Sequence, residues 1–277
     1  MTYATIMVCL ALDQSNEARL QVAGELAERF EAALIGVAAA QFAPPLYFAE
    51  GAEAQVLIDQ GEASVKRRLA GLEAQFRSAV KNRGGHVEWR GAMDYPARFV
   101  LAQARCADII VSGGRSPAFS DAFSLASPKD LVMQAGRPLL VVPDGTKWLD
   151  LRHVLVAWKD TPEARRAVAD ALPMLRKARD VTIVEIPDQD DDRSAVMAGV
   201  SDVAAWLGRH GVTATARVSE AAGNDSPPAR LEQVAGDVGA GLIVAGAYGH
   251  SRFRELILGG VTQYLITQTA RSVLLSH

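Results

Sequence analysis

Short apolar runs alternate along the chain with longer segments in which apolar residues recur every three or four positions. The first half opens on the run Thr5–Leu12, which predicts a strand, and from Asn16 the apolar positions take a helical spacing. The alternation continues as far as Val142. The further elements expected in this half are strands at 33–38, 86–90, 108–111 and 139–142 and helices at 55–81, 96–106 and 129–134.

The same series begins again after the polar connector at 143–147. Glu163–Arg165 repeats the residues of Glu17–Arg19, so the second copy keeps the register of the first. A repeat of this length predicts two domains of one architecture, residues 1–145 and 150–277. The second set is expected to comprise strands at 152–158, 181–186, 213–218, 242–245 and 272–275 and helices starting near 163, 195, 231 and 261.

Strands that alternate with helices in this way predict an α/β fold. Each half is expected to be a doubly wound, parallel, five-stranded sheet with helices on both faces. In such sheets the ligand crevice lies at the carboxyl ends of the strands. Residues that directly follow a strand are therefore the first candidates for a functional site.

Composition and charge narrow the class of protein. A net charge of -3 and a pI near 6.0 argue against nucleic acid as the main partner. The apolar runs are far shorter than the roughly 20 residues that cross a bilayer, and no secretory pattern opens the chain, so we expect a cytoplasmic protein. Cys9 and Cys106 are expected to be buried free thiols, and the acidic segment 188–193 a solvated loop.

A glycine-rich segment follows the strand expected at 242–245. It contains Gly246, Gly249, Gly259 and Gly260, and a helical spacing begins directly after them. Glycine lets backbone amides approach a phosphate closely, and the free N–H groups at a helix N-terminus favour anions. A strand, a glycine-rich loop and a helix in this order predict a phosphate-binding site.

These features resemble the universal stress protein family, with two copies of its domain in tandem. In nucleotide-binding members of that family, the ATP phosphates meet a glycine, two residues, a second glycine, nine residues, a third glycine and then Ser or Thr. Gly246, Gly249 and Gly259 stand at this spacing, whereas Gly260 takes the place of the hydroxyl residue. Thr262, in the first helical turn, offers a hydroxyl nearby.

The resemblance also assigns residues to the rest of a nucleotide. The family usually has an Asp after the first strand that touches the ribose, and here that position is Lys159, or Asp160 after a shift of one residue. A lysine there could instead meet a phosphate as a point charge. The family holds adenine partly through backbone at the end of the second strand, which corresponds to Ile186. His250 and Arg252 would lie beside the phosphates.

The first half departs further from the family pattern. In its equivalent loop Gly113 and Ser127 are kept, whereas Ser116 and Ala126 stand where the second half has Gly249 and Gly259. Added side chains at those two positions would occupy space that a phosphate needs. We therefore expect one nucleotide site, in residues 150–277.

The function implied is that of a stress-response protein which binds ATP or a related adenine nucleotide, with or without Mg²⁺, as a sensor or regulatory module. Two alternatives are an interaction module that has lost its nucleotide site and a slow ATPase that uses His250. In the family the fifth strands pair across a dimer. By analogy, Leu139–Val142 could pair with Val273–Leu275 as a pseudo-dimer within the chain, with a homodimer of whole chains and an unknown protein partner left open. The apolar segment 42–48 is expected to pack on the long helix or on the other half.

Overall fold

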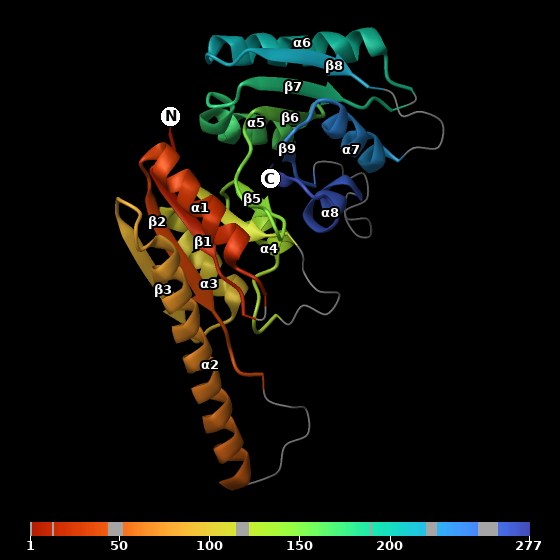
Figure 1. Cartoon of the computed structure of the whole chain (residues 1–277). Coiled ribbons are helices and arrows are strands. Elements are labelled where there is room, and N and C mark those ends of the chain that lie inside the picture. The colour runs from red at the N-terminus through yellow and green to blue at the C-terminus, as the bar shows by residue number, and fades with distance from the viewer. Residues whose placement is uncertain are drawn as a thin grey trace.

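A computed structural model describes residues 2–12, 14–43, 52–114, 122–188, 190–219, 226–248 and 260–277. Among these residues, no helix combines the length and the apolar character that crossing a membrane requires. The chain forms one continuous sheet covered by helices (Figure 1).

The first half follows the predicted order of elements closely. Its long helix α2 extends beyond the body of the fold (Figure 1). The elements are β1 (Thr5–Cys9), α1 (Glu17–Phe30), β2 (Ala33–Ala39), α2 (Ala52–Val80), β3 (Val87–Ala92), α3 (Pro96–Gln103), the 3-10 turn η1 (Ala104–Cys106), β4 (Ile109–Gly113), α4 (Pro128–Gln134) and β5 (Leu139–Val142).

The second half repeats this series. Two of its helices begin at side-chain caps: Thr161 accepts a hydrogen bond from the Ala164 amide, and Asp192 accepts one from the Ser194 amide. The elements are β6 (His153–Trp158), α5 (Pro162–Leu175), β7 (Asp180–Glu185), α6 (Arg193–Arg209), β8 (Ala214–Val218), α7 (Pro227–Asp237), β9 (Leu242–Gly246), α8 (Gly260–Thr267) and β10 (Ser272–Ser276).

The ten strands formed by the described residues lie in the order β3-β2-β1-β4-β5-β10-β9-β6-β7-β8. Each half therefore has the same internal strand order, and all pairs within a half are parallel. The halves join through one antiparallel pair, in which Leu274 stands opposite Leu140. The pairing of the two fifth strands within the chain, expected by analogy, is thus confirmed.

Helices cover both faces of the sheet. Buried residues of α1, α2, α5 and α6 pack in one apolar core, and buried residues of α3, α4, α7 and α8 pack in a second one on the opposite face. This arrangement confirms the doubly wound α/β class. It also leaves the carboxyl ends of the parallel strands open for a site.

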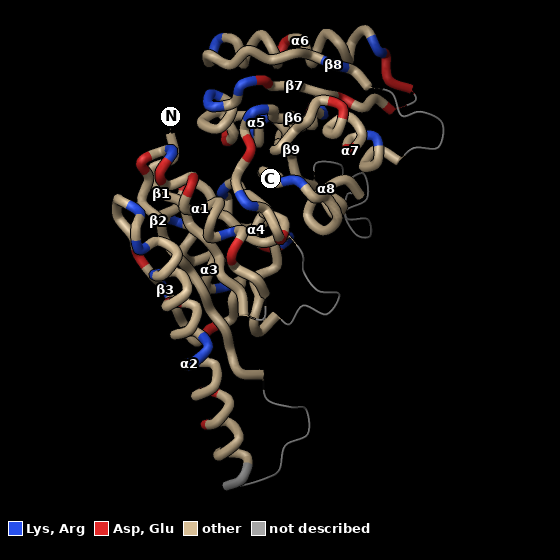
Figure 2. Tube along the Cα trace, in the orientation of Figure 1, with Lys and Arg blue, Asp and Glu red and all other residues tan. Residues whose placement is uncertain are grey.

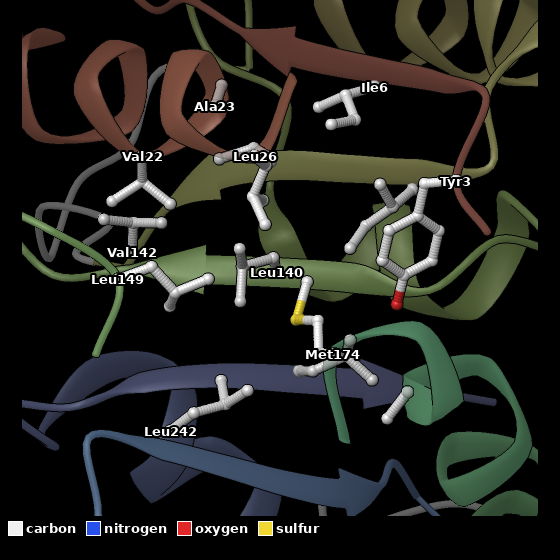
Figure 3. Close-up of a cluster of buried hydrophobic side chains, with 14 of the residues drawn as sticks. Tyr3, Ile6, Val22, Ala23, Leu26, Leu140, Val142, Leu149, Met174 and Leu242 are labelled. Atoms are coloured by element: carbon white, nitrogen blue, oxygen red, sulfur yellow. The ribbon is translucent and has the colours of Figure 1, made fainter. Parts of the chain in front are cut away.

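The two halves pack together along the β5–β10 pair. Figure 3 shows Met174 of α5 beside Leu140 of β5 and Tyr3, and all three side chains belong to one buried cluster. The Tyr3 hydroxyl donates to the Asp170 carbonyl oxygen at 2.7 Å, and the Ser276 hydroxyl donates to the Asp170 carboxylate at 2.8 Å. The sheet and both of its cores are therefore continuous across the halves.

Two predictions about burial have different outcomes. Cys9 is a buried free thiol, but Cys106 is exposed, so that expectation was wrong. Cys106 ends the turn after α3, and its Sγ atom receives a hydrogen bond at 2.9 Å from Arg90 of the edge strand β3. Phe42 packs closely over Gly61 of the long helix α2, as expected for the start of the apolar segment. Residues 44–48 of that segment lie outside the described part of the chain.

Candidate functional site

A cavity of about 310 Å³ opens at the carboxyl ends of β6, β7 and β9. The first residues of α5, α7 and α8 also reach it, which brings several helix N-termini to one place. Figure 1 shows α7 and α8 on the same side of the second half. The cavity lining includes Trp158, Lys159, Thr161, Ile186, Asp188, Leu231, Gly246, Tyr248, Gly260 and Thr262.

Half of the predicted site residues meet in this cavity. Lys159, Ile186, Gly246, Gly260 and Thr262 all line it, although they come from four separate segments of the sequence. Four other predicted residues, Gly249, His250, Arg252 and Gly259, lie outside the described residues.

Asp160, the tenth predicted residue, turns to the other face of the sheet. Its carboxylate pairs with Arg165 at 2.6 Å, and both side chains line a different cavity of about 510 Å³ beside Trp206. Of the two residues proposed for the position after the first strand, it is Lys159 that lines the cavity among the helix N-termini.

Gly246 is required by packing. A Cβ atom at this position would lie 2.5 Å from the backbone nitrogen of Ala164, in the first turn of α5. Only glycine lets the end of β9 and the start of α5 approach this closely. The sequence pattern assigned Gly246 to phosphate contact alone, so the helix contact is an additional reason for the glycine.

The start of α8 forms one end of the cavity. Tyr248 has a left-handed backbone with φ of 61°, and its amide donates to the Thr262 Oγ1 atom at 3.3 Å. Thr262 is 5% exposed. Through this hydrogen bond its hydroxyl links the segment after β9 to the first turn of α8. Gly260 is exposed, and no described residue lies within 4 Å of a Cβ atom built there. In the described part of the chain, nothing fills the place of the missing hydroxyl at position 260.

Lys159 is held by carboxylates that follow β7. Its Nζ atom donates to Asp188 and to Asp191 at 3.0 Å each, and it lies 3.9 Å from Glu185. Burial lowers the pKa of Lys159, but the hydrogen bonds and the negative charges of Asp188 and Asp191 together outweigh it and hold the pKa above its ordinary value. Figure 2 shows the acidic stretch where β7 leads toward α6. The described residues of the acidic loop are largely exposed, as expected, and two of its carboxylates also bind Lys159.

The cavity combines two kinds of surface. At one end, the N-terminus of α8 presents backbone N–H groups that have no acceptor within the helix, which favours an anion. Toward β7, the side chains of Ile186 and Leu231 supply an apolar wall. Such a combination suits a ligand with a charged end and a flat apolar end. Tyr248, Trp158 and Asp188 also line the cavity, and the glycine and strand patterns gave no signal for them.

The equivalent position in the first half is almost filled. The cavity there measures about 10 Å³ and is lined by Cys9, Arg19, Ser112 and Ala126 among others. Arg19 is 2% exposed, and its guanidinium donates to the Cys9 carbonyl oxygen at 3.1 Å and to the Gln14 side chain at 2.9 Å. The matching residue of the second half, Arg165, is turned outward. The two halves thus share a fold and differ at the site.

Comparison with known proteins finds a family match in the second half. Residues 150–277 match the model of the Universal stress protein family. Among solved structures, a universal stress protein from Archaeoglobus fulgidus DSM 4304 superposes with a TM-score of 0.68 at 14% identity, covering 98% of this chain and 95% of that chain. A functionally unknown protein from Pseudomonas aeruginosa PAO1 gives a TM-score of 0.58 at 13% identity, covering 99% and 92%. These likenesses show the fold of the whole chain. Among curated proteins, none matches the sequence.

Proposed function

We propose that the universal stress protein domain at residues 150–277 binds ATP or a related adenine nucleotide and acts as a sensor or regulatory module in the response to stress. The observation that carries the proposal is the convergence of Lys159, Ile186, Gly246, Gly260 and Thr262 around one cavity. Its volume of about 310 Å³ falls at the lower end of the range for ligand pockets, about 300–1,000 Å³.

The proposed orientation follows from the two kinds of surface. The phosphates lie at the start of α8, where Gly260 leaves the backbone amides accessible. The adenine lies against the apolar wall at the end of β7, beside Ile186. When Mg²⁺ accompanies ATP, it would neutralise part of the phosphate charge.

We further propose that residues 1–145 are a second domain of the same family that holds no nucleotide. The buried Arg19 side chain occupies the position that corresponds to the cavity of the second half. Opening a site there would require this guanidinium to leave its hydrogen bonds with Cys9 and Gln14. The two halves would then have divided roles, with one binding nucleotide and the other supporting it.

Calorimetric titration with ATP, with and without Mg²⁺, tests the proposal. The wild type should bind one nucleotide per chain. Gly260→Asp places a carboxylate at a Cβ position that no described residue approaches within 4 Å, and the N-terminus of α8 favours its negative charge. This charge repels the phosphates and should lower the affinity for ATP about tenfold or more. Gly260→Asn has a similar shape without the charge and should bind well. No binding by the wild type at millimolar ATP would contradict the proposal.

The alternative of an interaction module without nucleotide predicts an empty crevice, which the Lys159 side chain or an apolar ligand could close. Lys159 binds Asp188 and Asp191, and the cavity beside it stays open. The titration with ATP therefore separates this alternative from the proposal. The slow ATPase depends on His250, which lies outside the described residues.

A further inference from the structure

We infer that Asp188, positioned by Lys159, accepts hydrogen bonds from the ribose hydroxyls of the nucleotide, so that the site selects ribonucleotides over nucleotides that lack these hydroxyls. This inference rests on the proposed function and deepens it. The carboxylate would come from the loop after β7, whereas the position after the first strand of this half carries the lysine.

The order of the strands places the parts of the ligand. β9, β6 and β7 are successive neighbours in the sheet, so the ends of β9 and β7 are about 10 Å apart, twice the usual strand spacing. A nucleotide with its phosphates at the β9 end and its base at the β7 end has its ribose over the end of β6. Lys159 directly follows β6, so the ribose lies close to this residue.

Lys159 brings a carboxylate to this middle position. Asp188 belongs to the segment after β7, but its Oδ2 atom lies 3.0 Å from Lys159 Nζ, at the end of β6. Within the described part of the chain, Oδ2 is the only side-chain atom of Asp188 that takes part in a hydrogen bond, and the side chain is 74% exposed along the cavity. An ionised carboxylate accepts hydrogen bonds from both hydroxyls of a vicinal diol.

Asp191 has a different role although it bonds the same lysine. Its Oδ2 atom accepts from Lys159 Nζ at 3.0 Å and from the backbone amide of Asp188 at 2.9 Å, so it holds the turn in place. Asp191 does not line the cavity. The two aspartates therefore form a matched pair with equal charge, the same lysine partner and equal distances, and only Asp188 faces the ligand.

The test compares the affinities of ATP and 2′,3′-dideoxy-ATP for the full chain by calorimetry. The ratio of the two affinities is the readout, because a change in net charge near the phosphates affects both nucleotides alike. The wild type should prefer ATP on the order of tenfold or more, since hydrogen bonds to a charged group are lost with the dideoxy nucleotide. In Asp188→Asn the ratio should fall below about threefold, because a neutral acceptor makes a weaker hydrogen bond.

Asp191→Asn removes the same charge from the same lysine and should keep the ratio of the wild type. Equal affinity of the wild type for both nucleotides, or a full ratio in Asp188→Asn, would overturn the inference. If both variants lost the preference for ATP, the preference would come from the charge of the loop, and the inference would again be overturned. Failure of the proposed function has a different result, in which neither nucleotide binds any of the three proteins.

Discussion

The guanidinium of Arg19 lies directly over Gly113, so that a Cβ atom on this glycine would come within 2.1 Å of Arg19 Nη2. Gly113 ends β4 and Gly246 ends β9, at equivalent places in the two halves. The neighbour of Gly246 is the backbone of Ala164, at 2.5 Å. Glycines at equivalent positions therefore face different neighbours. Gly113 accommodates the end of a flexible side chain, whereas Gly246 accommodates the backbone of a helix.

This difference predicts unequal effects of an added methyl group. Gly246→Ala should destabilise the protein by about 1–3 kcal/mol, because the start of α5 has to move away from the sheet. Gly113→Ala should cost less, since the end of the arginine side chain can shift. Urea unfolding of the two variants measures both effects. Equal or reversed losses would show that the contact between Gly246 and α5 is not as close as described.

A hydroxyl at position 260 should strengthen nucleotide binding. Gly260 begins α8, and no described residue lies within 4 Å of its Cβ position, so Gly260→Ser adds a donor beside the proposed phosphates. A hydrogen bond to a charged group should raise the affinity for ATP by about tenfold. Gly260→Ala is the control, because it adds the Cβ atom without a hydrogen-bond donor. The prediction fails if Ser binds ATP no better than Ala.

Glu185 should make stability depend on pH. Burial raises the pKa of this carboxyl, Lys159 opposes the shift, and the neighbouring Asp191, Asp160 and Asp188 add to it. A raised pKa means that the folded state holds the proton more tightly than the unfolded state. The stabilisation is therefore complete below the unfolded pKa and is lost as the pH rises through the folded pKa.

Glu185→Gln stays uncharged at every pH, which fixes the sign of its effect. The variant should be more stable than the wild type at neutral pH. Its advantage should shrink as the pH falls through the raised folded pKa and should level off below about pH 4, near the ordinary pKa of an unfolded glutamate. Urea unfolding of both proteins between acidic and neutral pH measures the difference. An advantage that is the same at every pH would mean that the effect does not come from the charge of Glu185.

The two halves should unfold in a single transition, because the β5–β10 pair joins them. Leu274 of β10 stands opposite Leu140 of β5, and both are fully buried. Leu274→Ala should cost about 2–5 kcal/mol through the cavity it leaves, and calorimetry should still show one transition for the whole chain. Leu57→Ala, on the exposed start of α2, is the control and should change little. Two separate transitions in the wild type would show that the halves are independent.

The sequence predicted the order of elements and the pairing of the fifth strands, because apolar periodicity and an internal repeat are local signals. The glycine spacing is also a local signal, and it predicted a site at the end of β9 that includes Gly246 and Gly260. It did not predict that Lys159 bonds Asp188 and Asp191, because these side chains meet only after two strands have paired.

The contrast between Arg19 and Arg165 was also beyond the sequence pattern. Both follow the same Glu-Ala pair at the start of a helix, yet one is buried and the other exposed. One signal was present, since Arg165 has an aspartate partner, Asp160, where Arg19 has the uncharged Gln14. Whether an arginine turns inward depends on the space left by the rest of the fold, and that space is a tertiary property.

Hydrogen exchange with and without ATP, followed peptide by peptide, tests the central claim most directly, because it reports where on the chain the nucleotide binds. Saturating ATP should slow exchange in the segments around the cavity, 157–161, 184–188, 242–248 and 260–264. It should leave 5–12 and 109–113, the equivalent segments of the first half, unchanged. Protection confined to the first half, or no protection at saturating ATP, would contradict the account.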